Sequence, residues 1–137
     1  MTADKKQAKL YNGATLAYVG DAVTETFVRS YLVVNGVTDT AHVNELALMF
    51  VTAHAQSDAY AKLEGLLTEE ERGILVRGRN AKLTHRPKNQ TQSDYRRATG
   101  FEALMGYLYL SGRSDRAEEL FRKAYAETLE AIKDRTL

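Results

Sequence analysis

The sequence predicts an all-α fold, and three observations support this prediction. Proline, the residue that most strongly interrupts helices, occurs only once among the 137 residues, as Pro87. The nine glycines lie mainly where apolar segments with helical spacing end. No segment of useful length alternates apolar and polar residues in the manner of a strand. We therefore expect one helical domain of about six helices, covering residues 1–137.

Three helices are expected in the first half of the chain. A short helix over residues 4–11 precedes a long helix over 14–34, and a third covers 41–59. Asn-Gly pairs follow the first two, as is common at helix C-termini, and the Thr-Asp-Thr run at 38–40 offers N-caps for the third. Residues at helical spacing give the long helix one apolar face, made of Leu16, Val19, Val23, Phe27 and Val34.

Three more helices are expected in the second half, over residues 68–78, 93–110 and 115–133. Thr68 and Glu71 have the spacing of a capping box, which predicts where the first of these begins. Residues 81–92 are rich in polar residues and contain the proline, so we expect a loop there. The core face of the last helix is predicted to hold Ala117, Leu120, Ala124 and Leu129.

The composition excludes several classes of protein. Hydrophobic residues make up 44% and charged residues 27%, which is typical of a folded globular domain. The absence of cysteine excludes disulfides, thiolate nucleophiles and cysteine-bound zinc, and it fits a cytoplasmic location. No apolar run approaches the ~20 residues that a membrane-spanning helix needs.

The charge of the chain is unevenly distributed. The net charge is +1, but residues 72–97 hold eight basic residues and one acid, a net charge of +7, which leaves −6 for the rest. A concentrated basic segment in a nearly neutral chain favours contact with a polyanion, although a solvated loop between charged helix ends would look the same. The basic side chains that would bind the phosphates of such a partner are Arg77, Arg79, Lys82, Arg86 and Lys88.

Two carboxylates interrupt apolar helices. Asp21 lies in LAYVGDAV and Glu102 in FEALMGYLYL, each beside small residues. Carboxylates brought together in a core repel each other, and a hard divalent cation between them would offset this. Glu25, four residues after Asp21, is a supporting candidate ligand. The alternative is that Arg29, Arg96 or Arg97 pairs with these acids inside the fold.

These motifs resemble the ribonuclease III family, and most closely its compact bacterial branch, Mini-ribonuclease III. The segments that carry the resemblance are LAYVGDAV, RGRNAK, RPKN and YRRATGFEALMGYLYL, within residues 12–112. The resemblance implies that Asp21 and Glu102 are catalytic residues that hold Mg²⁺, for which Mn²⁺ could substitute. Two further acidic positions of the larger family are occupied here by Ala17 and Thr99, as in the Mini-ribonuclease III pattern.

The same resemblance implies a homodimeric endonuclease that cuts double-stranded RNA and leaves 5′-phosphate and 3′-hydroxyl ends. It also implies maturation of precursor stems of large-subunit (23S) ribosomal RNA, with a large-subunit ribosomal protein as a conceivable partner. The double-stranded RNA-binding domain usual in the family has no counterpart in the sequence. Two alternatives remain: a non-catalytic RNA-binding or ribosome-assembly module on the same fold, and a helical interaction domain that does not bind RNA.

Overall fold

A computed structural model describes residues 1–82 and 86–136, and this part of the chain is all-helical, as predicted. Its helices are, in order, α1 (Lys5–Ala8), α2 (Gly13–Val34), α3 (Thr40–Val51), α4 (Ala53–Leu63), α5 (Glu69–Arg79), α6 (Gln92–Leu110), α7 (Ser114–Ala124) and α8 (Ala126–Thr136). None of the helices in this part is long and apolar enough to cross a bilayer.

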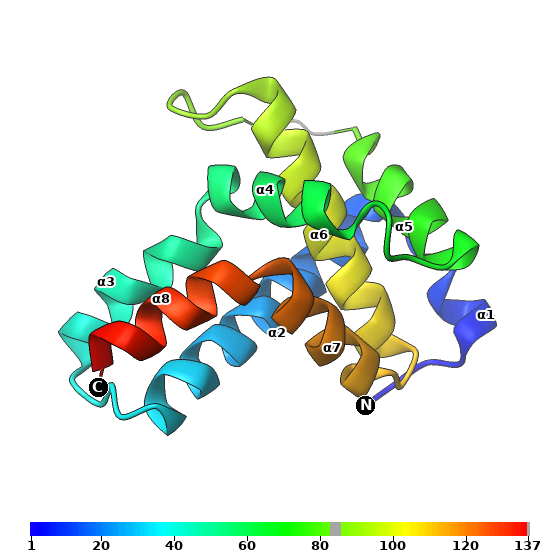
Figure 1. The fold of residues 1–137 in the computed structure, drawn as a ribbon. Helices are drawn as coiled ribbons and strands as arrows, with labels where there is room; N and C mark the ends of the chain where they lie inside the picture. Colours follow the sequence, from blue (N-terminus) through cyan, green and yellow to red (C-terminus); the bar gives the residue numbers. More distant parts are fainter. Residues whose placement is uncertain (83–85, 137) are drawn as a thin grey trace.

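Helix α6 occupies the centre of the fold. It packs most extensively against α2, α4 and α5, and it also contacts α7 (Figure 1). Every residue from Ala98 to Leu108 except Glu102 is buried. A carboxylate in the middle of this helix is therefore surrounded by other helices, and the position of its charge is set by how they pack.

Two of the predicted helices are each divided in the structure. Residues 41–59 form α3 and α4 because Thr52 is extended (φ −68°, ψ 154°) and its hydroxyl accepts a hydrogen bond from the amide of Ala55. Residues 115–133 form α7 and α8 because the chain leaves the helical conformation at Tyr125. The described part of the chain thus has eight helices where about six were predicted.

The predicted helix ends are largely confirmed. Thr68 and Glu71 form a complete capping box at the start of α5. Gly36 and Gly112 have φ values of +94° and +77°, a conformation that residues with a Cβ rarely adopt, so the glycines end α2 and α6 where expected. Of the loop predicted over residues 81–92, residues 81–82 and 86–91 are non-helical and Gln92 begins α6. Residues 83–85 lie outside the described residues.

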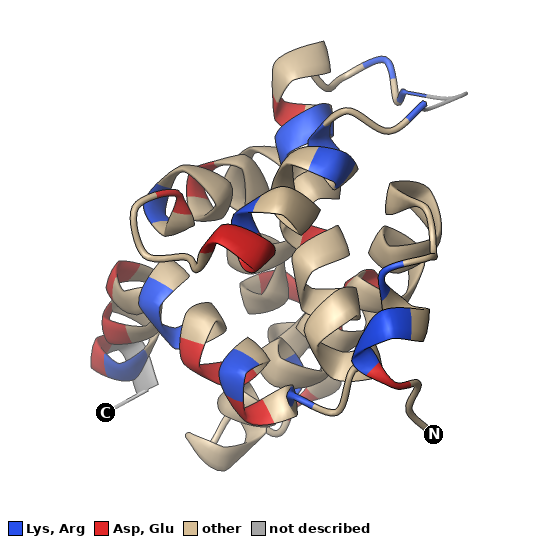
Figure 2. Ribbon diagram, turned by 90° about the vertical axis from the view of Figure 1, so that its right-hand side faces the viewer, with Lys and Arg blue, Asp and Glu red and all other residues tan. Residues whose placement is uncertain are grey.

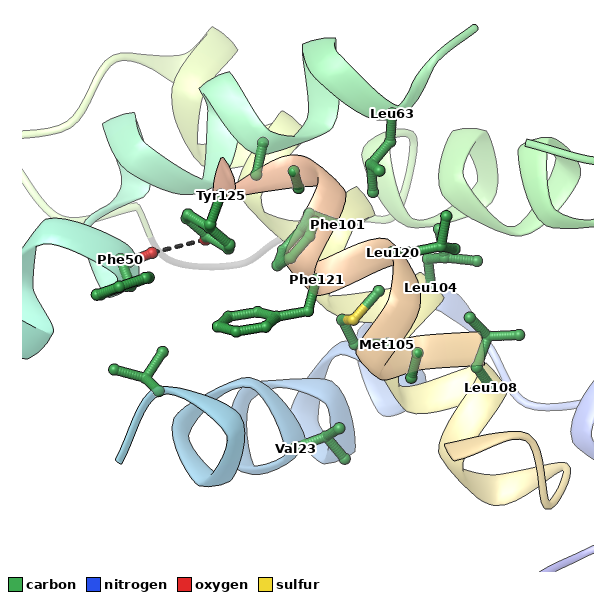
Figure 3. Close-up of a cluster of buried hydrophobic side chains, with 14 of the residues drawn as sticks. Val23, Phe50, Leu63, Phe101, Leu104, Met105, Leu108, Leu120, Phe121 and Tyr125 are labelled. Carbon is green, nitrogen blue, oxygen red and sulfur yellow. Dashed lines mark hydrogen bonds between the residues drawn. The ribbon is translucent and has the colours of Figure 1, made fainter. Parts of the chain in front are cut away.

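The apolar core joins α6 to α2, α3, α4 and α7, and Figure 3 shows its central part. Phe101 meets the ring of Tyr125 edge-on, with centroids 5.8 Å apart. The Tyr125 hydroxyl donates a 2.7 Å hydrogen bond to the carbonyl oxygen of Phe50, which ties the α7–α8 junction to α3. The predicted core residues Ala117, Leu120, Ala124 and Leu129 are buried, whereas Val34, predicted on the apolar face of α2, is 84% exposed.

Candidate active site

Helices α2 and α6 cross with their backbones in contact at two glycines. A Cβ on Gly20 would lie 1.6 Å from the carbonyl oxygen of Glu102, and a Cβ on Gly106 would lie 2.0 Å from the carbonyl oxygen of Leu16. Only glycine allows so close an approach. The space that the missing side chain of Gly20 leaves is filled by the backbone of α6. The crossing is what places Asp21, the next residue along α2, beside Glu102.

Asp21 and Glu102 line one cavity of about 170 Å³. Two amide side chains share it: Gln56 comes from α4, and Gln90 comes from the loop before α6. The rest of the lining is Val51, Ala53, Tyr95, Ala98 and Thr99. A larger groove of about 790 Å³ lies between α2, α7 and α8, but it holds neither carboxylate. The smaller cavity is therefore the candidate active site, because it concentrates polar oxygens in apolar surroundings.

The surroundings of Glu102 favour its neutral form. Burial is the largest cause, and contact with the Asp21 carboxyl is the next; together they raise the pKa of Glu102 to about 9. A hydrogen bond from the Gln56 side chain acts in the opposite direction and favours the carboxylate. Glu102, in hydrogen-bonding contact with Asp21, thus keeps its proton near neutral pH in the protein alone.

The structure does not support pairing of these acids with arginine. Among the residues with described side chains, neither Asp21 nor Glu102 lies within ion-pair distance of a lysine or arginine. Arg29 instead bonds Glu25, with 3.1 Å between Nε and Oε2. If both acids were ionised, the cavity would carry two negative charges. No cationic side chain among the described residues is close enough to offset them.

Glu25 does not join the other two acids. Its side chain is engaged with Arg29, and it does not line the cavity, although its charge contributes to the raised pKa of Glu102. No three His, Cys, Asp or Glu side chains in the described part of the chain are grouped so that they could hold a metal ion. The structure thus brings together two of the three predicted metal ligands.

The predicted RNA-binding residues fall into two groups. Arg77 donates to the carbonyl oxygens of Lys9 (2.6 Å) and Tyr11 (3.3 Å), and Arg79 donates to the Tyr60 hydroxyl (3.1 Å). These two arginines thus hold parts of the fold together. Lys82, Arg86 and Lys88 are exposed, as Arg77 also is, and the hydrogen bond of Arg86 goes to the nearby backbone of Gln90. Lys82, Arg86 and Lys88 lie on the connection between α5 and α6, whose described parts stand out from the helical body in Figure 2.

The comparisons with known proteins agree with this arrangement. A family model described as the ribonuclease III domain matches residues 14–113. The chain belongs to this family. It is 48% identical over 114 residues to Mini-ribonuclease 3 of Enterococcus faecalis, an alignment that covers 82% of this chain and 86% of the relative. Mini-ribonuclease 3 of Brevibacillus brevis is 40% identical over 121 residues, covering 88% and 90%. These relatives assign the chain to the Mini-ribonuclease 3 branch.

A solved structure of the same fold supports the assignment. The crystal structure of a protein from Fusobacterium nucleatum superimposes with a TM-score of 0.78 at 30% sequence identity. The superposition covers 88% of this chain and 93% of the other. The helical arrangement described above is thus found in a second protein.

Two site residues of this ribonuclease III family member were not found from the sequence. Gln56 lies in AHAQSDAY, which reads as part of one long helix until the break at Thr52 is known. Gln90 lies in a polar loop in which every residue looks exposed. Thr99, by contrast, was noted in the sequence and does line the cavity, but its hydroxyl donates to the carbonyl oxygen of Tyr95 (2.8 Å).

Proposed function

We propose that this protein is a Mg²⁺-dependent endoribonuclease that cleaves double-stranded RNA. The observation that carries the proposal is the contact between Asp21 and Glu102 in a cavity without a cationic partner in the described part of the chain. The contact between the two acids helps to keep Glu102 protonated in the protein alone, and a divalent cation is what would stabilise both in the ionised form. The similarity to proteins named Mini-ribonuclease 3 supports the same activity.

The donor atoms fit magnesium. Among the described residues that line the cavity, the polar side chains apart from the tyrosine and threonine hydroxyls are two carboxylates and two amides, and none is a histidine or cysteine. Mg²⁺ prefers oxygen ligands and commonly takes one or two carboxylates, with water and phosphate oxygens completing its shell. Mn²⁺ shares this preference and is the expected substitute. A bound cation would supply Lewis acidity toward the phosphate and lower the pKa of a water molecule.

The protein's own residues have separate roles in this proposal. Asp21 and Glu102 hold the cation, and Glu102 must first release the proton that its surroundings favour. Gln56 is 4% exposed, and it assists that release because its hydrogen bond stabilises the carboxylate of Glu102. Hydrolysis of the phosphodiester is expected to leave a 5′-phosphate and a 3′-hydroxyl.

RNA binding is assigned to the exposed part of the basic segment. Lys82, Arg86 and Lys88 lie on the loop that also supplies Gln90 to the cavity, so a phosphate backbone held by them would pass the carboxylates. Duplex RNA is recognised mainly by its shape and its phosphate and 2′-hydroxyl groups. We therefore expect little preference for base sequence.

The biological setting is proposed from the family resemblance. The protein is expected to act as a cytoplasmic homodimer in which each copy cuts one strand. Its substrate would be a precursor stem of 23S ribosomal RNA, and a large-subunit ribosomal protein could present that stem. Light scattering during gel filtration would test the dimer, and sequencing of the cut ends of precursor RNA would test the substrate.

The central experiment removes one carboxylate charge. With Asp21→Asn, cleavage of a perfect RNA duplex in Mg²⁺ should fall by at least a hundredfold while the circular dichroism spectrum is unchanged. Asp134→Asn, on the exposed end of α8, is the matched control and should cleave like the parent protein. Activity retained by Asp21→Asn would exclude this site as the catalytic centre.

A second candidate function is a non-catalytic RNA-binding module. The absence of two acids favours this function: Ala17 and Thr99 occupy positions at which the larger family has carboxylates. This module would bind duplex RNA with the salt dependence typical of phosphate contacts. It would yield no Mg²⁺-dependent products at any protein concentration, and the cleavage assay above separates the two functions.

A further inference from the structure

The cavity contains a buried amide oxygen without a partner. Gln90 Oε1 is buried and accepts no hydrogen bond from the described residues. Its side chain lines the cavity together with Asp21 and Glu102. Leaving a buried acceptor unsatisfied destabilises a protein, because the group gives up its hydrogen bonds to water and gains none in the fold. The Gln90 oxygen therefore lacks a hydrogen bond in the protein alone, and a ligand in the candidate site could satisfy it.

Gln90 is held in place from both sides along the chain. Its amide donates to the carbonyl oxygen of Pro87 (3.1 Å), and its own carbonyl oxygen accepts from Arg86 Nη1 (2.9 Å). The next residue, Thr91, caps α6 through a 3.0 Å hydrogen bond from the Asp94 amide to its hydroxyl. The position of the Gln90 backbone is therefore fixed by a turn and a helix start before any ligand arrives.

The chemistry of the cavity restricts what this oxygen can meet. An amide oxygen accepts hydrogen bonds and binds cations, but it repels the oxygens of a phosphate. The acidic side chains opposite it likewise favour a positive occupant. A cation, or water bound to one, satisfies the amide oxygen and both carboxylates at once.

We propose that Gln90 supplies a third protein oxygen to the cation site, by direct contact or through one bound water. The inference rests on the proposed function, because it assumes that Asp21 and Glu102 hold the cation. It explains how a site with only two carboxylates reaches a sufficient ligand set. It also places a cation ligand and Arg86, a proposed RNA contact, on the same turn.

The test measures Mn²⁺ binding without RNA, from the loss of the free Mn²⁺ signal in electron paramagnetic resonance. Gln90→Leu keeps the approximate size of the side chain and removes the acceptor, so the dissociation constant should rise about tenfold. Gln90→Glu adds a charge at the same place and should bind Mn²⁺ several-fold more tightly than the parent. The control is Gln92→Leu, an exposed glutamine that does not line the cavity, and it should bind like the parent.

Thermal unfolding in EDTA separates this role from a structural one. Because Gln90→Leu removes an unsatisfied acceptor, the metal-free variant should unfold at the parent's temperature or higher. A glutamine needed only for the fold would give the reverse, a lower unfolding temperature with unchanged Mn²⁺ affinity. That pair of results would overturn the inference.

Two further outcomes are distinguishable. If Gln90→Leu binds Mn²⁺ like the parent but cleaves RNA poorly, Gln90 contacts RNA and the inference fails. Asp21→Asn is titrated in the same series to test the underlying assumption. Unchanged binding by Asp21→Asn would refute the cation site itself, whereas loss of binding in Asp21→Asn together with normal binding in Gln90→Leu would refute only the role of Gln90.

Discussion

The backbone of Gly20 lies directly against the backbone of Glu102, so closely that there is no room for a methyl group between α2 and α6. The two carboxylates of the candidate site are the side chains of Glu102 and of the residue after Gly20. Their proximity is therefore a consequence of helix packing, which the reciprocal glycine Gly106 supports from α6. The same contact that closes the core also assembles the site.

Gly20→Ala should consequently damage the fold and the site together. The added Cβ would clash with backbone atoms, which cannot rotate away as a side chain can, so the helices must separate. We expect a loss of about 3 kcal/mol in the free energy of unfolding, measured by urea denaturation, with loss of cleavage. The control is Gly73→Ala in α5, where a Cβ meets nothing within 4 Å, and it should gain up to about 1 kcal/mol. If the two substitutions changed the free energy of unfolding equally, the backbones of α2 and α6 would not be in contact at Gly20.

Glu102→Gln should change how stability depends on pH. In the folded protein the pKa of Glu102 is about 9, against an ordinary value of 4.5, so the folded state retains a proton that the unfolded state loses. The stabilisation is complete below pH 4.5 and is lost as the pH rises toward 9, by at most about 1.4 kcal/mol per pH unit. Glutamine cannot ionise, so the variant should lack this decline and unfold at a higher temperature than the parent at pH 8.

The measurement is thermal unfolding from pH 5 to pH 9 in EDTA. Glu45→Gln, an exposed acid on α3, should retain the decline of the parent protein and serves as the control. If the unfolding temperatures of the parent and of Glu102→Gln changed equally with pH, this result would contradict the raised pKa of Glu102.

Cation binding should release the proton from the acid pair. Below pH 9, Mn²⁺ must displace the proton of Glu102, so the affinity for Mn²⁺ should rise about tenfold per pH unit between pH 6 and pH 8. Calorimetric titration in two buffers with different ionisation enthalpies counts the protons released, and the expected number is close to one. No proton release would mean that the pair is already fully ionised in the free protein.

Much of the site could be predicted from the sequence because its signals are local. Asp21 and Glu102 are charges inside apolar helical segments, and such a charge is conspicuous in a single chain. The sequence does not reveal why they meet. The role of Gly20 depends on the backbone of a helix about eighty residues later in the chain, and no local pattern encodes that contact.

The errors have the same origin. The long helix expected over residues 41–59 has continuous helical propensity, and only the extended conformation of Thr52 divides it. That break defines a separate α4, which brings Gln56 into the cavity. Gln90 is hidden for a different reason: a glutamine in a polar loop has no feature that distinguishes a buried amide from an exposed one. Tertiary packing decided these points, and local propensity could not.

Removing the exposed basic residues should weaken RNA binding without affecting the fold. A variant with Lys82, Arg86 and Lys88 changed to alanine should lose affinity for a duplex, and the slope of log affinity against log salt should fall by roughly two to three. Filter binding at several salt concentrations measures this slope, with the Asp21→Asn background preventing cleavage. The control variant changes Lys62, Arg122 and Lys123, which are exposed on α4 and α7. An equal loss in the control would indicate general charge attraction without a defined surface.

Arg77 should behave differently from Lys88, although the sequence places both in the basic segment. Arg77 donates to the carbonyl oxygens of Lys9 and Tyr11, so it anchors the segment before α2 to the end of α5. Arg77→Ala leaves these carbonyls without that donor and should lower the free energy of unfolding by about 1 kcal/mol, since the site is partly open to solvent. Lys88→Ala should leave stability unchanged, as measured by urea denaturation, and reduce only duplex affinity. If Arg77→Ala weakened RNA binding with no loss of stability, Arg77 would belong with the exposed residues of the RNA-binding surface.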